Sequence, residues 1–214
     1  MTTSKLIDIG TKPEYKPPQF HRQKTEWLFP VPLWGFGLPN CVDINKSIED
    51  RVYEKSKKEE TWKASNEGGW HSEGNIHNDP VMKPITKFIE WAVRELSTES
   101  KIEYKDYSLF LWANINQPGD YNTVHDHPDT HMSGVYYVKL PRGDCGKLRI
   151  YNPMYSYNYN SDGYNPPYKQ PRVDINGKEG ALLIFRAPLL HDVTRNNTKE
   201  DRISLSFNIR FIGG

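Results

Sequence analysis

Residues 202–212, RISLSFNIRFI, give the clearest indication of the fold class, because apolar and polar side chains alternate along them as far as residue 211. The apolar positions are Ile203, Leu205, Phe207, Ile209 and Phe211, and the polar ones are Arg202, Ser204, Ser206, Asn208 and Arg210. A period of two is that of a β-strand whose two faces meet different surroundings. One face packs on a hydrophobic core, and the other, in a β-barrel that holds a ligand, lines the interior.

Further segments upstream predict a mainly β chain. Runs rich in aromatic and β-branched residues, bounded by turn residues, predict strands at 107–114, 133–140, 147–151 and 181–185. A run near Trp27–Trp34 predicts a first strand at a sheet edge, because its prolines cannot donate to a ladder. The Lys-, Pro- and Thr-rich residues 1–24 predict a flexible arm, and residues 25–214 predict a single domain.

Two helices are expected to support the barrel over about residues 43–98. Between Asp43 and Lys57 apolar residues recur every four positions, and the other face is charged. For the second helix, Asp79 can cap the first turn. Pro84 does not suit the interior of a helix, however, so regular helix is expected to begin only at Pro84. Its apolar stripe ends near Ser97 and predicts packing on a sheet.

The composition narrows the classes of partner. The chain has 214 residues and a formal net charge of +1, so no basic excess indicates nucleic acid. No apolar run is long enough to cross a membrane, and the polar N-terminus does not resemble a secretory signal. Cys41 and Cys145 form no CxxC pair. These features predict a soluble, cytoplasmic protein without membrane or nucleic-acid partners.

A metal site is indicated by a histidine-rich segment, residues 125–131 (HDHPDTH), and by the later His191. His125, His127 and Asp129 are two residues apart, so on an extended strand they point to one side. An antiparallel partner strand can bring His191 beside them. Imidazole and carboxylate ligands suit Fe(II) and leave positions open for a co-substrate and oxygen. Two ligand sets fit: His127, Asp129 and His191, or His125, His127 and His191.

The motif Arg202-Ile203-Ser204 follows His191 after ten intervening residues. A guanidinium placed just beyond the last metal ligand can hold the carboxylate of an acidic co-substrate by a bidentate contact. Ser204 points to the same side of the strand and can add a hydrogen bond.

Several motifs together resemble a known family, the 2-oxoglutarate- and Fe(II)-dependent oxygenases of the prolyl-hydroxylase-like group. The resemblance is to the uncharacterised bacterial and phage branch of that group and covers about residues 27–212. The motifs are Trp112-Ala113-Asn114, Gly119, His125-x-His127-Pro128, residues 133–138 (SGVYYV), Phe185, His191 and residues 202–208 (RISLSFN), with upstream matches at 29–32 and 69–72. The resemblance implies a double-stranded β-helix, a jelly-roll or cupin-like barrel over about residues 105–212.

The resemblance also implies the cofactors Fe(II) and 2-oxoglutarate. Arg202 matches the position that pairs with the distal carboxylate of 2-oxoglutarate, and Tyr137 matches a carboxylate-binding hydroxyl. Asn114 is expected to line the same pocket. The H-x-H-P pattern of the branch favours His125 and His127, whereas a carboxylate from Asp129 would help to offset the charge of Fe(II). Both ligand sets therefore stay open.

The implied activity is hydroxylation of a small-molecule or peptide substrate with release of succinate and CO2, by a chain that forms a homodimer. One alternative is a cupin-like metalloprotein, a three-histidine dioxygenase or an isomerase, that does not use 2-oxoglutarate. Another is a non-enzymatic jelly-roll binding module. The substrate itself is met by loops, here residues 151–171 and 68–71, whose composition does not specify a ligand.

Overall fold

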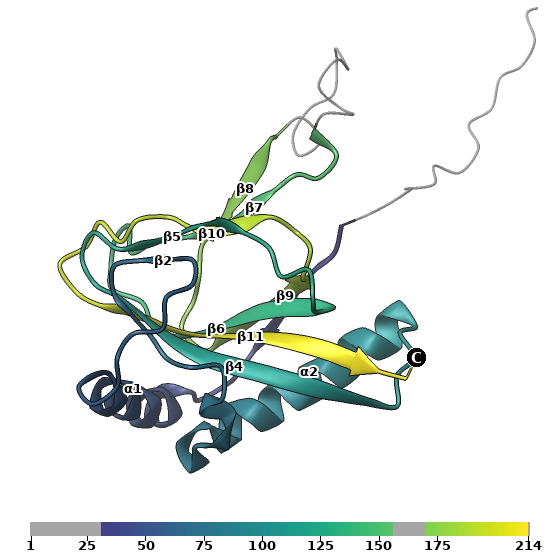
Figure 1. Cartoon of the computed structure of the whole chain (residues 1–214), viewed down its shortest axis with the longest axis horizontal. Helices are drawn as coiled ribbons and strands as arrows, with labels where there is room; N and C mark the ends of the chain where they lie inside the picture. Colours follow the sequence, from purple (N-terminus) through teal and green to yellow (C-terminus); the bar gives the residue numbers. More distant parts are fainter. Residues whose placement is uncertain (1–30, 156–169, 214) are drawn as a thin grey trace, which may run out of the picture. The chain divides into compact units, whose positions relative to one another are not determined.

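The computed structural model describes residues 31–155 and 170–213, which contain two antiparallel β-sheets (Figure 1). The strand order of the larger sheet is β1 (Leu33–Gly37), β9 (Ala181–Arg186), β6 (Met132–Lys139), β11 (Arg202–Ile212), β4 (Asp106–Asn116) and β3 (Trp70–His71). That of the smaller sheet is β2 (Asn66–Glu67), β5 (Tyr121–His125), β10 (His191–Val193), β7 (Leu148–Tyr151) and β8 (Arg172–Ile175).

The two sheets face each other, and the helices lie beyond the larger one (Figure 1). This arrangement confirms the expected mainly β fold, a double-stranded β-helix with supporting helices. No helix in the described part of the chain is long and apolar enough to cross a membrane. The flexible arm expected at 1–24 lies outside the described residues, as does most of the loop at 151–171.

The helices are α1 (Val42–Ser56) and α2 (Lys83–Ser100), with short 3-10 turns η1 (Ile76–Asn78) and η2 (Pro80–Met82) between them. Asp79 does cap a turn, because its carboxylate accepts from the Val81 N–H at 3.0 Å, but that turn is only η2. Regular helix begins at Lys83, so Pro84 lies in the first turn, where a missing N–H costs nothing. The helix continues to Ser100, beyond the expected end near Ser97.

The main hydrophobic core lies between the helices and one face of the larger sheet. Ile203, Leu205, Phe207 and Ile209 of β11 are fully buried there together with helix residues such as Ile48 and Ile89. Each such side chain contributes about 1.5–3 kcal/mol relative to an exposed one. The prediction that the two faces of residues 202–212 differ is therefore confirmed. The polar side chains on the opposite face lie outside this core and can form a site.

β1 is the first strand of the described residues. It starts at Leu33, where that residue pairs with Phe185 of β9, and the expected start near Trp27 lies outside the described residues. Pro32 immediately precedes it and has no N–H to offer to the ladder. Its place at the edge of the larger sheet confirms the expected edge position.

Gly134 of β6 is expected to tolerate no side chain. A Cβ there would lie 2.3 Å from Cζ of Phe207 and 2.6 Å from the backbone oxygen of Leu183. Gly134→Ala should therefore lower the free energy of unfolding by about 1–3 kcal/mol, as measured by urea denaturation. Gly37→Ala in β1 is the matched control, since a Cβ there meets nothing within 4 Å. Equal effects of the two substitutions would show that this close contact does not limit position 134.

Candidate metal centre

Two neighbouring strands of the smaller sheet bring three histidines together. His125 ends β5, His191 begins β10, and the two residues are directly paired. His127 follows two residues later, where its backbone N–H donates to the carbonyl of Ala187 at 3.0 Å. The ring centroids are 4.3 Å apart for His125 and His191, and 5.3 Å apart for His127 and His191. One nitrogen from each ring lies within 4.8 Å of the others, a grouping that could hold a metal ion.

Backbone carbonyls orient two of these rings. Nδ1 of His125 donates to the carbonyl of Thr123 at 2.7 Å, and Nδ1 of His191 donates to the carbonyl of Leu189 at 2.8 Å. Because a carbonyl can only accept, the proton of each neutral ring lies on Nδ1. The lone pair of Nε2 is then available to a metal, and contacts of this kind are typical of metal-binding histidines.

The three rings are held in their neutral form. Burial, and to a lesser degree the neighbouring imidazoles, lower the pKa of His127 to about 4 and that of His191 to about 3. Burial likewise lowers the pKa of His125. Neutral imidazole is the form that ligates metals, so a metal would meet little competition from protons near neutral pH.

The lowered pKa values predict that the metal-free protein loses stability in mild acid. Between the pKa of about 6.5 in the unfolded chain and the folded values of about 4 and 3, the unfolded state binds more protons. The free energy of unfolding should therefore fall between pH 7 and pH 5, by on the order of 1–2 kcal/mol for each of His127 and His191. Urea denaturation at several pH values measures this slope. The slope should be smaller in His191→Gln, and an equal slope in the two proteins would contradict the prediction.

The structure does not bring Asp129 into this group. Its side chain is exposed, and it lies in a turn in which the N–H of Thr130 donates to the carbonyl of His127 at 3.2 Å. The spacing of two fails here because the extended strand ends at His125 and the chain reverses after His127. Of the two ligand sets left open by the sequence, the described residues assemble only the one made of three histidines.

Arg202 lies on the same cavity, at the start of β11, and its side chain is only 1% exposed. Its Nη1 donates to Oδ1 of Asn116 and to Oγ of Ser204, both at 3.0 Å. Its Nε has no hydrogen-bond partner, and no acidic side chain among the described residues forms an ion pair with it. Burial lowers its pKa, since charge is disfavoured away from water. A buried guanidinium without a counterion favours an anionic ligand.

The other residues expected at the co-substrate site lie around Arg202. The ring centroid of Tyr137 is 5.5 Å from Cζ of Arg202, and the buried Tyr137 hydroxyl has no hydrogen-bond partner within the described part of the chain. Ser204 and Asn114 line the cavity. Nδ2 of Asn114 donates to Oγ of Ser206 at 3.1 Å, while its Oδ1 accepts from none of the described residues. These unsatisfied polar atoms, like the free Nε of the guanidinium, suit a bound polar ligand.

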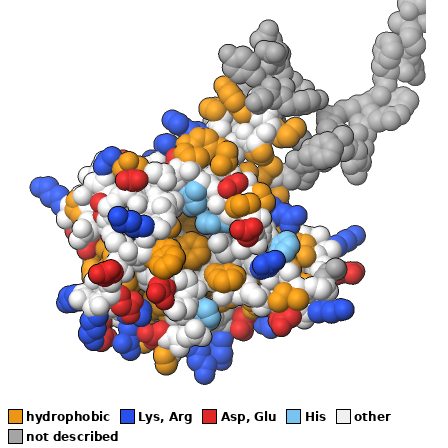
Figure 2. All heavy atoms as spheres, in the orientation of Figure 1, with side chains coloured by type: hydrophobic (Ala, Val, Ile, Leu, Met, Phe, Trp, Pro, Cys, Tyr) orange, Lys and Arg blue, Asp and Glu red, His pale blue; other side chains and the backbone are white. Residues whose placement is uncertain are grey.

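Apolar side chains complete the cavity, which lies between the two sheets. Histidine side chains lie beside apolar ones on the face drawn in Figure 2. The apolar lining residues include Trp112, Val135, Leu148, Phe185 and Val193. Such a lining excludes water and strengthens the electrostatic interactions inside.

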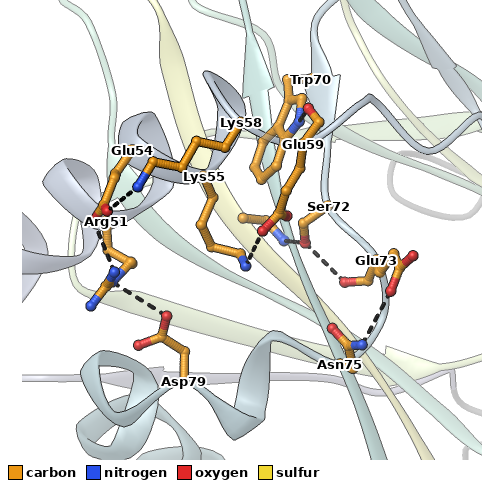
Figure 3. Close-up of polar contacts among 11 residues, drawn as sticks. Arg51, Glu54, Lys55, Lys58, Glu59, Trp70, Ser72, Glu73, Asn75 and Asp79 are labelled. Carbon is orange, nitrogen blue, oxygen red and sulfur yellow. Dashed lines mark hydrogen bonds and ion pairs between the residues drawn. The ribbon is translucent and has the colours of Figure 1, made fainter.

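Trp112 lines the cavity, and His71, which ends the 68–71 segment expected to meet the substrate, packs against it. The Trp112 ring meets the His127 ring edge-on at 5.9 Å and stacks on the buried His71 ring at 5.6 Å. The residues on either side of His71 hold its strand in place (Figure 3). Trp70 Nε1 donates to the carbonyl of Glu59 at 3.0 Å, and the Ser72 hydroxyl donates to the carbonyl of Glu73 at 2.9 Å.

Three neutral imidazoles, two of them with Nε2 unoccupied, suit a divalent first-row transition metal, Fe(II) among them. The unpaired guanidinium of Arg202 and the free hydroxyl of Tyr137 suit a carboxylate. Fe(II) and the dicarboxylate 2-oxoglutarate therefore both fit the residues that are present.

Comparisons with known proteins agree with this description. Residues 110–208 match the model of a family described as "Putative 2OG-Fe(II) oxygenase". A prolyl-4-hydroxylase from Pseudomonas putida is 15% identical, with a TM-score of 0.63 over 86% of this chain and 94% of that one. The viral collagen prolyl hydroxylase of Paramecium bursaria Chlorella virus-1, solved as a 2-oxoglutarate complex, is also 15% identical, with a TM-score of 0.57 over 84% and 96%.

A third similar structure is the α-ketoglutarate-dependent epimerase SnoN from nogalamycin biosynthesis. It is 13% identical, with a TM-score of 0.63 over 85% of this chain and 78% of that one. At such low identity these structures establish a shared fold. No curated protein matches this sequence.

Proposed function

We propose that the protein is a 2-oxoglutarate- and Fe(II)-dependent dioxygenase, the family whose model residues 110–208 match, and that it hydroxylates a small-molecule or peptide substrate and releases succinate and CO2. Bound Fe(II), with 2-oxoglutarate and dioxygen, supplies the oxidant for such a reaction. The observation that carries the proposal is the buried, unpaired guanidinium of Arg202 on the same cavity as three clustered histidines.

Each side chain has a distinct role in this proposal. His125, His127 and His191 would hold Fe(II), the first and last through Nε2 because their Nδ1 atoms are occupied. Arg202 would bind the distal carboxylate of 2-oxoglutarate, with hydroxyls from Tyr137 and Ser204 beside it. Asn114, whose Oδ1 has no partner, is proposed to line the co-substrate pocket.

The remainder of the cavity supports a substrate that presents an unactivated C–H bond. Trp112 and Phe185 place aromatic surface beside the histidines, with ring centroids 5.9 Å from His127 and 4.8 Å from His191. This apolar wall can position a hydrocarbon group close to the metal and keep water away from it. Orientation of this kind is the main contribution of the protein when a metal carries the chemistry.

A three-histidine dioxygenase that does not use 2-oxoglutarate would present a similar set of ligands. Such an enzyme has no need for a buried cation beside the metal site. Arg202 is fully enclosed and has no acidic partner among the described residues, which is unfavourable unless an anion binds there. This difference favours the 2-oxoglutarate-dependent reaction.

Turnover of the co-substrate tests the proposal. Protein loaded with Fe(II) and supplied with 2-oxoglutarate and air should release succinate, as followed by proton NMR, even before the substrate is known. Protein loaded with Zn(II) is the control, because Zn(II) has no redox chemistry. Added peptides or small molecules that accelerate succinate release would identify the substrate class. Iron-loaded protein that consumes no 2-oxoglutarate would overturn the proposal.

We also propose that the protein works in the cytoplasm. Cys41 and Cys145 are both free thiols, which supports a reducing compartment. Protein isolated from its native cells should then retain both thiols, as counted by alkylation and mass spectrometry, and a disulfide would contradict this location.

A further inference from the structure

Asn116 and Ser204 both hold the guanidinium of Arg202 at Nη1. Nη1 donates to Oδ1 of Asn116 and to Oγ of Ser204 at 3.0 Å each. Its Nε donates to nothing among the described residues. A planar guanidinium fixed at one nitrogen has its remaining donors fixed in direction as well. The contacts at Nη1 therefore orient the edge that is left for a ligand.

Asn116 is placed to do this by strand pairing. It ends β4 directly opposite Arg202 of β11, and its side chain is 2% exposed. Its backbone carbonyl accepts from Nδ2 of Asn196 at 2.9 Å, which fixes the end of the strand.

The amide of Asn116 also begins a chain of hydrogen bonds across the barrel. Because a guanidinium only donates, Oδ1 of Asn116 must face Arg202, and its Nδ2 donates to Oδ1 of Asn122 at 3.3 Å. Nδ2 of Asn122, in β5, then donates to Oγ of Ser65 at 3.2 Å. The guanidinium thus sets the donor-to-acceptor direction of all these hydrogen bonds. They in turn fix the side-chain rotamers of Asn116 and Asn122.

Both residues that contact Nη1 are uncharged. An aspartate at position 116 would satisfy the same Nη1 donor and would also compensate its charge. With asparagine and serine as partners, the positive charge of Arg202 stays unbalanced by any described side chain. That charge is then available to a ligand.

We propose that Asn116 is a positioning residue for the co-substrate: it holds Nη1 of Arg202 and, being neutral, leaves the charge of the guanidinium to the distal carboxylate of 2-oxoglutarate. This inference rests on the proposed function, since it assumes that 2-oxoglutarate is the anion. It also separates two properties of the side chain, its hydrogen-bond acceptor and its lack of charge, which substitutions can vary independently.

Two variants test the two properties. Asn116→Ala removes the acceptor, and the Kd for 2-oxoglutarate should rise at least about tenfold, as for other lost orienting contacts in metal sites. Asn116→Asp keeps the acceptor and the shape but adds a carboxylate that competes with 2-oxoglutarate for the guanidinium. It should raise the Kd further than alanine does. Asn208→Asp is the control, because it adds the same charge at the other end of the polar face of β11.

The Kd is measured by calorimetry with 2-oxoglutarate and Fe(II)-loaded protein under nitrogen. In urea denaturation without metal, Asn116→Asp should be at least as stable as Asn116→Ala, because Asp gives the buried guanidinium a partner. A purely structural role predicts the opposite order of Kd, with Asp close to wild type. The inference is overturned if Asn116→Asp binds within twofold of wild type, or if it is less stable than Asn116→Ala. Wild-type protein that binds iron but no 2-oxoglutarate would instead overturn the proposed function, and this inference with it.

Discussion

Replacing His191 by alanine is expected to abolish function by removing a ligand of the metal. His191 is the most enclosed of the three histidines, at 6% exposure, and its ring is oriented by the carbonyl of Leu189. Loss of one orienting contact in a metal site costs 10–100-fold in affinity, so loss of a ligand should cost more than about 100-fold. Equilibrium dialysis against Fe(II) under nitrogen, with iron assayed in the protein, measures the effect. Succinate release should fall to the level of the Zn(II)-loaded protein.

Asp129→Ala is the matched comparison, because the sequence offers Asp129 as a ligand while the structure places it exposed in a turn. Iron affinity should stay within about threefold of wild type in this variant. If Asp129→Ala loses iron as His191→Ala does, then the carboxylate does reach the metal and the three-histidine assignment is wrong. Circular dichroism of both metal-free variants separates loss of a ligand from loss of the fold.

Replacing Arg202 by methionine should abolish 2-oxoglutarate binding and leave iron in place. Removing one partner of a buried, hydrogen-bonded charge pair costs about 2–5 kcal/mol, which raises Kd by about thirty- to several-thousand-fold. Iron should remain because the histidines lie on β5 and β10 and the loop after β5, whereas Arg202 lies on β11 of the other sheet. Calorimetry with 2-oxoglutarate and dialysis with Fe(II) give the two affinities separately.

Arg202→Met also tests how the buried cation affects the stability of the metal-free protein. Arg202 is a buried cation without an acidic partner among the described residues, so an apolar side chain of similar length should leave the metal-free protein equally or more stable. Arg210→Met, on the exposed end of the same strand, is the control and should change neither affinity. Loss of iron in Arg202→Met would show that the guanidinium supports the metal site rather than the co-substrate.

Much of the fold could be predicted because its signals are local. The alternation along residues 202–212 assigned both faces of β11 correctly, with Leu205 and Phe207 in the core and Arg202 and Ser204 on the cavity. A proline indicates an edge strand without indicating the residue at which its hydrogen bonding begins, and β1 is described from Leu33. The extent of α2 also depended on which proline opens regular helix, and sequence alone left both starts open.

The residues of the candidate site could be predicted where side chains alternate along a regular strand, but not where the chain turns. The alternation of side chains along a strand placed His125 and His127 on one side. The same alternation also placed Asp129 there, but the chain turns after His127 and Asp129 lies away from the histidines. Asn116 was not predicted, although it shares a face of β4 with Trp112 and Asn114. Its contact with Arg202 follows only from the pairing of β4 with β11. The pairing of His191 with His125 likewise depends on the register between two strands, which no local pattern contains.

The most direct test of the central claim is an anaerobic titration of Fe(II)-loaded protein with 2-oxoglutarate, followed by visible absorption. The claim is that three histidines hold Fe(II) beside a guanidinium that binds the co-substrate. It predicts a charge-transfer band that grows to saturation at one 2-oxoglutarate per iron, and that is lost in Arg202→Met while iron is retained. Iron bound at the histidines without any band on adding 2-oxoglutarate would contradict it.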